Sequence, residues 1–194
     1  MEFPASIQIK EHKVLLVHKG NLINDFMRGK FSVVGIECNS RGAYGSPLQK
    51  HIAAIFPQML TQLAELTYDR KLLGTANIFR VPSRGNARQY VANMFLASGY
   101  GLGRDSKNRG TKPVNRFSER FLRNAMEQVL ESCDKYKLPV DRQIAIQRVY
   151  GGLGGVSWAE VQTVLDDICD KHKFSLYAYL PTTYDTQFVR GTTR

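Results

Sequence analysis

A glycine-rich turn between an apolar run and a helix-like run constrains the fold of this chain more than any other stretch. The turn reads Gly151-Gly152-Leu153-Gly154-Gly155-Val156, and residues 144–149 and 159–165 form the flanking runs. Glycines let the backbone approach phosphate oxygens, and N–H groups at a helix start point toward negative charge. Ser157 suits the N-cap of the helix, and Glu160 three residues later completes a capping box. The sequence therefore predicts a cradle for an anion.

Strand and helix patterns alternate along the chain and predict an α/β protein. Helical spacing occurs over 48–66, with a break at Pro57, over 117–130 and over 158–169, and strand patterns cover 6–10, 13–18, 31–38, 75–81, 89–96, 143–149 and 174–180. We expect a three-layer α/β/α sandwich with a central mixed β-sheet, in which the first strands run antiparallel to the rest. One domain should cover 1–180. The tail 181–194 has little apolar content, which is typical of a disordered end.

Composition limits the class of protein. A chain of 194 residues with 43% hydrophobic residues can bury a substantial core. Its three cysteines are odd in number and show no CxxC spacing, which argues against a disulfide scaffold or a zinc site and fits a reducing compartment. No apolar run is long enough to span a membrane, and no secretory signal pattern occurs. These features predict a cytoplasmic protein without a metal, a cofactor or a membrane partner.

The net charge of +10 favours an anionic partner, either a nucleotide or a nucleic acid. Much of the excess lies in the glycine-containing segment 104–116, for which a solvated loop is an equally good interpretation. Nucleic-acid binding would favour aromatic platforms among the charges, and none occurs between Leu102 and Arg116. Nucleic acid therefore stays an alternative to a nucleotide.

Further polar or glycine-rich loops follow other expected strands. Because parallel strands direct the loops after their carboxyl ends into one crevice, such loops are candidates for gripping one extended ligand. Each loop alone is a weak signal, since a turn asparagine or glycine is structural about as often as functional. The candidate ligand contacts from these loops are Asn21, Leu22, Asn39, Gly42, Ala43, Tyr44, Gly45, Gly99, Tyr100 and Tyr150.

These segments together resemble the macrodomain family. Gly20-Asn21-Leu22 is similar to the family's GN[IL], and 38–45 is similar to its CNxxGxWG. The stretch 146–158 is similar to MPxIxxGLGGxxW, and the resemblance covers roughly 14–180 in the family's order. The resemblance is to the branch of small ADP-ribose-1''-phosphate phosphatases and their phage relatives. If a phage encodes the chain, we expect the protein in the host cytoplasm.

The resemblance implies that the ligand is ADP-ribose or a related nucleotide, free or attached to a protein or nucleic acid. Asn21 and Leu22 would contact the adenine side, and Asn39 the distal ribose. The first glycine loop, 42–45, would line the pyrophosphate and distal ribose, and the turn at 152–156 would supply the main phosphate cradle.

The departures from the family pattern fall on positions used for chemistry. Gly154 stands where a branch of ADP-ribosyl-ester hydrolases has an aspartate, and Ile36 stands where the phosphatase branch has a histidine. Pro47 replaces a glycine of the first loop. Glu37 and Ser40 are the remaining weak candidates for proton chemistry.

Three hypotheses remain open. The chain hydrolyses ADP-ribose-1''-phosphate or ADP-ribosyl conjugates, or it binds ADP-ribose without turnover as a reader or sponge. In the third hypothesis it is a basic nucleic-acid-binding protein on the same fold. The absence of the usual acid and base residues favours the second.

Overall fold

A six-stranded sheet forms the centre of the molecule. The computed structural model describes residues 15–42, 46–66, 69–83, 88–98, 117–138, 143–150 and 157–180. The strand order is β1-β6-β5-β2-β4-β3. The strands are β1 (Leu15–Lys19), β2 (Val33–Asn39), β3 (Ala76–Val81), β4 (Gln89–Ala97), β5 (Ile144–Gln147) and β6 (Leu176–Leu180).

The sheet is mixed, as the sequence predicts, but its antiparallel strand is not where we expected it. β1 pairs in parallel with β6, and β2, β4, β5 and β6 are also joined by parallel pairings. Only the β3–β4 pair is antiparallel within the described sheet. The prediction of antiparallel strands at the start was therefore wrong for β1. β3 and β4 are consecutive strands, which is the arrangement that permits antiparallel pairing, whereas the partner of β1 is β6 at the far end of the chain.

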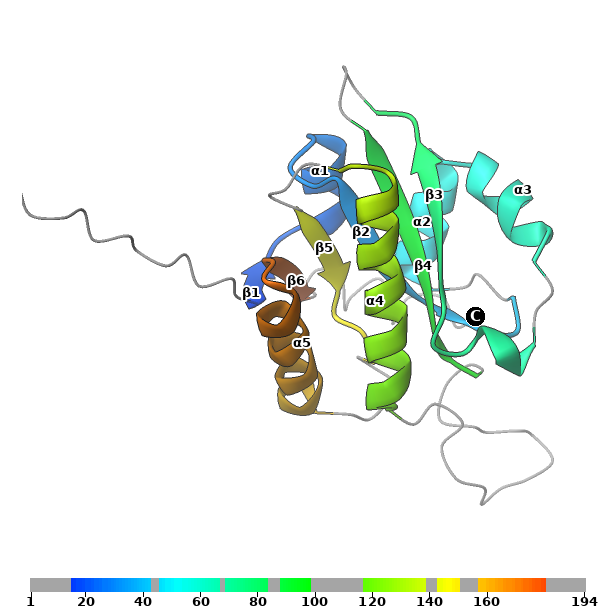
Figure 1. Ribbon diagram of the computed structural model, residues 1–194. Coiled ribbons are helices and arrows are strands. Elements are labelled where there is room, and N and C mark those ends of the chain that lie inside the picture. The colour runs from blue at the N-terminus through cyan, green and yellow to red at the C-terminus, as the bar shows by residue number, and fades with distance from the viewer. Residues whose placement is uncertain are drawn as a thin grey trace, which may run out of the picture.

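Helices cover both faces of the sheet and give the expected three layers (Figure 1). One face carries α4 and α5, and the other carries α1, α2 and α3. Pro57 divides the expected helix over 48–66 into two, as predicted. The helices are α1 (Leu22–Met27), α2 (Pro47–Ile55), α3 (Gln58–Ala64), α4 (Glu119–Lys135) and α5 (Trp158–His172).

Two hydrophobic cores lie on opposite faces of the sheet, because side chains alternate along each strand. On β4, Ala92 and Met94 pack toward α4 and α5, while Val91 and Phe95 pack toward α1, α2 and α3. Every residue of β4 is buried, as befits a strand covered by helices on both faces. The three cysteines are buried in these cores as thiols and form no disulfide with one another.

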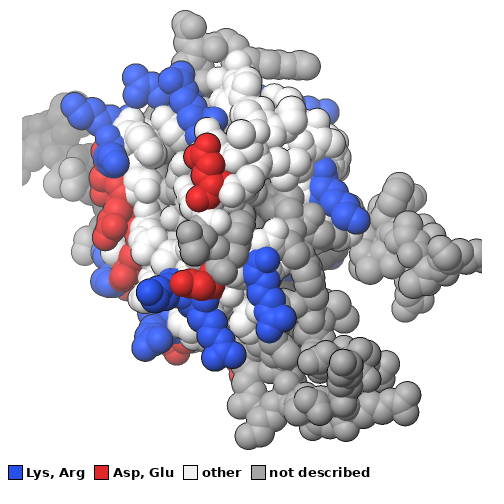
Figure 2. Space-filling view, turned by 90° about the vertical axis from the view of Figure 1, so that its right-hand side faces the viewer, with Lys and Arg blue, Asp and Glu red and all other residues white. Residues whose placement is uncertain are grey.

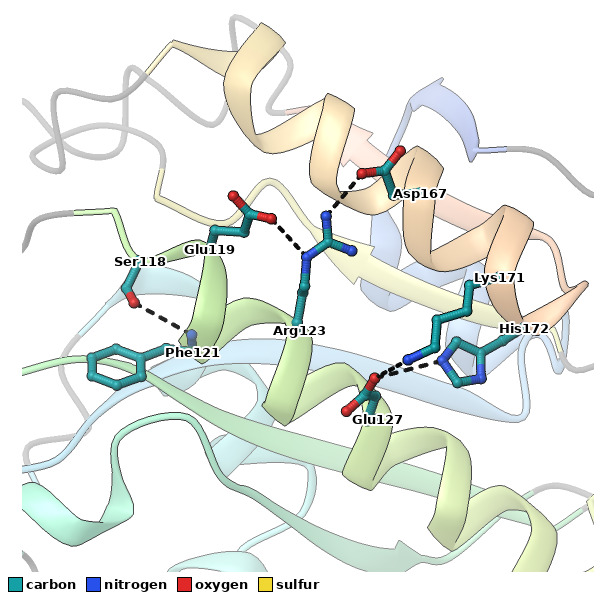
Figure 3. A network of polar contacts seen from close by, with 8 residues as sticks. All are labelled: Ser118, Glu119, Phe121, Arg123, Glu127, Asp167, Lys171 and His172. Carbon is teal, nitrogen blue, oxygen red and sulfur yellow. Dashed lines mark hydrogen bonds and ion pairs between the residues drawn. The ribbon is translucent and has the colours of Figure 1, made fainter.

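Salt bridges connect the exposed sides of α4 and α5 (Figure 3). The guanidinium of Arg123 lies 2.8 Å from both Glu119 and Asp167, so that it joins the two helices. Glu127 accepts a hydrogen bond of 2.6 Å from Lys171 on the facing helix. Exposed ion pairs of this kind contribute about 0–1 kcal/mol each, so the apolar contacts beneath them hold the helices together.

The division into a domain over 1–180 and a tail over 181–194 stays a prediction. The expected strand over 6–10 and the whole tail lie outside the described residues. Among the described helices, none is both long enough and apolar enough to cross a membrane.

Candidate functional site

The parallel strands bring three of the sequence-predicted loops to one edge of the sheet. β1 leads into Asn21, β2 ends at Asn39, and β5 leads into Tyr150. β1, β2 and β5 point the same way, because parallel pairings connect them through β6. Ligands of open α/β sheets bind at such a carboxyl edge. We call this edge the candidate cleft.

The end of β2 is held in a fixed conformation. Asn39 is 6% exposed, and its Oδ1 accepts a hydrogen bond of 3.0 Å from the backbone N–H of Arg41. The N–H of Ser40 donates to the carbonyl of Ala97 at 2.8 Å, which joins the ends of β2 and β4. Gly42 has a φ of 74°, a conformation that side chains disfavour. Asn39 is therefore oriented at the edge before any ligand arrives.

Helix α2 starts directly beside this strand end. Ser46 and Gln49 form a capping box, and Pro47 occupies the first turn, where its fixed φ and missing N–H cost nothing. The side chain of Gln49 donates to the carbonyl of Glu37 at 2.8 Å. The proline that departs from the family pattern therefore has a structural explanation: it begins α2, and that helix braces β2.

Glu37 connects the ends of β2 and β5. Its Oε2 accepts a hydrogen bond of 2.7 Å from the backbone N–H of Tyr150, which immediately precedes the glycine turn. Burial raises the pKa of Glu37, and this hydrogen bond offsets only part of the shift. The carboxyl group thus lies where β2 and β5 end, and a role in proton transfer stays a prediction.

Tyr150 has its ring in the protein core. The residue is 1% exposed, and its ring meets Phe117 edge-on with 5.0 Å between centroids. The hydroxyl donates to the carbonyl of Leu96 at 3.2 Å. The sequence leaves open whether this ring enters the cleft, and the structure instead packs it between β4 and α4. Its backbone has a φ of 55°, so the chain turns sharply there.

Helix α5 begins at the candidate cleft, after the glycine turn. Its capping box is confirmed: Ser157 Oγ accepts from the N–H of Glu160 at 3.3 Å, and Glu160 Oε2 accepts from Ser157. Arg148, at the end of β5, has its guanidinium carbon 5.9 Å from the ring centroid of Trp158. Trp158 packs partly buried against the core, as expected. Sequence reasoning did not single out Arg148, which adds positive charge at the start of α5.

The first loop, after β1, forms the start of α1. Asn21 is the N-cap, and its Oδ1 accepts from the N–H of Asn24 at 2.9 Å. Leu22 is 6% exposed and belongs to the core beneath α1. These contacts give both residues a structural role, and their contact with an adenine stays a prediction.

A buried polar network beside Asn21 was missed by sequence reasoning. Tyr179 Oη donates to Asp25 Oδ2 at 2.6 Å, and Lys30 Nζ lies 2.9 Å from Asp25 Oδ1. Burial raises the pKa of Asp25, but the hydrogen bonds from Tyr179 and Lys30 outweigh it and hold the pKa below its usual value. His18 lies against Tyr179 with ring centroids 4.7 Å apart. The contact between Tyr179 and Asp25 joins residues that are 154 positions apart, so no local sequence pattern predicts it.

Several predicted contacts lie outside the described residues. Their role in binding stays a prediction, and so does that of the basic segment 104–116. Among the described residues, no group of three His, Cys, Asp or Glu side chains is placed to hold a metal ion. Burial raises the pKa of the Cys38 thiol to about 12, so it is no nucleophile. The contacts outside the description are Ala43, Tyr44, Gly45, Gly99, Tyr100, Gly151, Gly152, Leu153, Gly154, Gly155 and Val156.

Comparison with solved structures gives the fold class. The macrodomain of Mycobacterium tuberculosis DarG aligns with a TM-score of 0.61 and 13% identity, over 88% of this chain and 99% of that one. Thermosipho africanus DarTG in complex with ADP-ribose aligns with a TM-score of 0.60 and 14% identity, over 86% of this chain and 42% of that one. A Trypanosoma brucei macrodomain in complex with ADP aligns with a TM-score of 0.54 and 10% identity, over 90% of this chain and 66% of that one.

This chain therefore has the macrodomain fold. No protein-family description matches the sequence, and no curated protein matches it either. The expected fold class is confirmed by the structure and by these neighbours. At such low identities the likeness concerns the fold, and function rests on the residues of the site.

Proposed function

We propose that this protein binds ADP-ribose, or a nucleotide derived from it, in the candidate cleft. The observation that carries the proposal is the meeting of the β1, β2 and β5 loops at one carboxyl edge. The glycine turn 151–156 follows β5 directly and leads into the start of α5. Structural neighbours with the same fold hold ADP-ribose or ADP, which supports the same ligand class here.

The described residues suit an extended diphosphate with a ribose at each end. Asn39 is fixed at the end of β2 by the contact of its Oδ1 with Arg41, an orientation suited to sugar hydroxyls. Arg148 lies over the ring of Trp158 at the start of α5, and a guanidinium there favours a phosphate group. The capping box already engages the N–H groups of Ser157 and Glu160. The phosphate donors are therefore the N–H groups of the turn.

The binding experiment is isothermal titration with ADP-ribose. Asn39→Asp retains the Oδ1 that accepts from Arg41 and removes the amide donor, so we expect affinity to fall at least tenfold while the protein stays folded. Gly152→Glu puts bulk and charge in the turn and should abolish binding. Arg28→Gln, a change in the exposed side chain of the C-cap residue that follows α1, is the control. Unchanged affinity in folded Asn39→Asp would remove the ribose assignment.

Hydrolysis is a second step of the proposal, and it depends on Glu37. The raised pKa of this carboxyl group at the candidate cleft favours its use as an acid or base for water. Candidate substrates are ADP-ribose-1''-phosphate and ADP-ribosyl conjugates of proteins or nucleic acids. Phosphate release should stop in Glu37→Gln while ADP-ribose affinity is kept. Binding without turnover in the wild type would instead assign a reader or sponge.

A further inference from the structure

A pocket that is open to solvent lies at the other end of the sheet; we call it the cavity. Its volume is about 470 Å³, and Arg80, Arg88, Tyr90 and Tyr136 line it. Arg80 lies opposite Tyr90 in the antiparallel β3–β4 pair, so both side chains share the sheet face that carries α4. Tyr136 is the C-cap residue of α4 and closes the cavity from the helix side. Cavities of this size hold small organic ligands.

The aromatic wall of the cavity is preformed. The rings of Tyr90 and Tyr136 stack with 5.0 Å between centroids and 14° between planes. Arg88 donates to the carbonyl of Tyr136 at 3.3 Å, which ties the start of β4 to the end of α4. The ammonium of Lys135 lies 5.9 Å from the Tyr136 ring centroid. The wall therefore needs little ordering when a ligand arrives.

Two arginines give the cavity a positive charge. Within the described part of the chain, no ion pair joins Arg80 or Arg88 to an acidic side chain, although both are exposed. Lys137 adds a further exposed cation just after α4. Figure 2, which looks onto the side with β3 and α3, shows Lys and Arg gathered at the upper left. Two guanidinium groups beside tyrosine rings suit a phosphate ester that carries a flat base.

We propose that this cavity binds a nucleotide unit, with its phosphate on Arg80 and Arg88 and its base against the partly exposed ring of Tyr136. Tyr90 is buried and supports the Tyr136 ring from behind. The unit comes either from a single-stranded nucleic acid or from a free nucleotide. Guanidinium planes and tyrosine rings both stack on bases, and a guanidinium fork matches phosphate oxygens.

The cavity is separate from the candidate cleft. It lies at the amino end of β4, whereas the cleft lies at the carboxyl ends of the same parallel strands. The nine residues of β4 place roughly 26 Å between these ends at about 3.3 Å per residue. The two sites are therefore testable one at a time.

The test measures binding of a fluorescent ten-nucleotide deoxythymidine strand and of AMP to the whole chain. We expect Arg80→Gln/Arg88→Gln to lower affinity for the strand at least tenfold. The slope of log affinity against log salt should also fall by about 1.4, the value for two lost phosphate contacts on a single strand. ADP-ribose affinity at the cleft should stay within twofold of the wild type.

The control is Arg28→Gln/Arg120→Gln, which removes the same charge from exposed side chains elsewhere. An equal loss of affinity in both double variants would overturn the proposal, because general charge would then explain binding. No binding of either probe to the wild type would overturn it as well.

Two further readouts specify the ligand. Strand affinity well above that for AMP assigns a nucleic acid, and equal affinities assign a free nucleotide. Tyr136→Leu should weaken AMP binding and leave competition by inorganic phosphate unchanged, since the phosphate contacts come from the arginines. If Tyr136→Leu, checked for folding by thermal melting, binds AMP as the wild type does, the base position against Tyr136 is wrong.

Discussion

At the residue scale, one carboxylate links the fold to the proposed chemistry. Glu37 accepts the backbone N–H of Tyr150, so it fixes the exit of β5 just before the glycine turn. The side chain therefore has a structural role whether or not it transfers a proton. Its raised pKa also makes it a source of pH-dependent stability.

We predict that Glu37→Gln makes stability less dependent on pH. Because the pKa of Glu37 is raised on folding, its contribution to the free energy of unfolding is full below its unfolded pKa of about 4.5 and is lost as pH rises through the folded pKa. A glutamine keeps the acceptor for the Tyr150 N–H without a charge to bury. In urea denaturation, the free energy of unfolding of the variant should rise relative to that of the wild type between pH 4 and pH 8. Parallel curves would contradict this.

At the element scale, the junction before β3 depends on a glycine. Gly74 follows the short 3₁₀ helix η1 (Arg70–Leu72), has a φ of 82° and donates to the carbonyl of Phe95 at 2.9 Å. A Cβ there would lie 3.2 Å from the Cα of Phe121 in the first turn of α4. The junction therefore needs both a left-handed backbone and close approach to a helix.

Two alanine substitutions separate these two requirements. Gly29 also has a φ of 82°, but a Cβ there would meet nothing within 4 Å. Gly29→Ala should cost about 1–2 kcal/mol from backbone strain alone. Gly74→Ala should cost roughly 1–3 kcal/mol more, because α4 must shift. Urea unfolding measures both values, and equal losses would show that contact with α4 has no energetic effect.

At the scale of the whole molecule, a buried polar pair connects the last strand of the described chain to its first helix. Tyr179 on β6 donates to Asp25 on α1. Burial raises the pKa of Asp25, but the hydrogen bonds from Tyr179 and Lys30 hold it below its usual value. Both residues pack on the face that carries α1, α2 and α3. Removal of the hydroxyl leaves a buried carboxylate short of one partner.

We expect Tyr179→Phe to lower the free energy of unfolding by about 1–3 kcal/mol at neutral pH. Because the pKa of Asp25 is lowered on folding, this contribution is present above the unfolded pKa of about 3.8 and is lost as pH falls through the folded pKa. The loss should therefore shrink on acidification. Tyr177→Phe is the matched control on the same strand. A similar loss in both variants would assign the effect to packing.

The sequence alone predicted the six described strands and the helices α2 to α5 in their order, because alternating and helical patterns record which side chains are buried. It did not predict α1, which has only six residues and too few turns for a clear helical pattern. It also determined the division of the helix at Pro57 and the capping box at Ser157, since both depend on neighbouring residues. It pointed to the macrodomain fold and to the loops of the candidate cleft.

Only the tertiary structure decided which contacts join distant segments. It placed β1 parallel to β6, buried the ring of Tyr150 and paired Glu37 with the backbone before the glycine turn. It also brought Arg80 and Arg88 to Tyr136 at the end of α4. Local patterns cannot specify such pairings, because they depend on strand order and on how two helices cross a sheet.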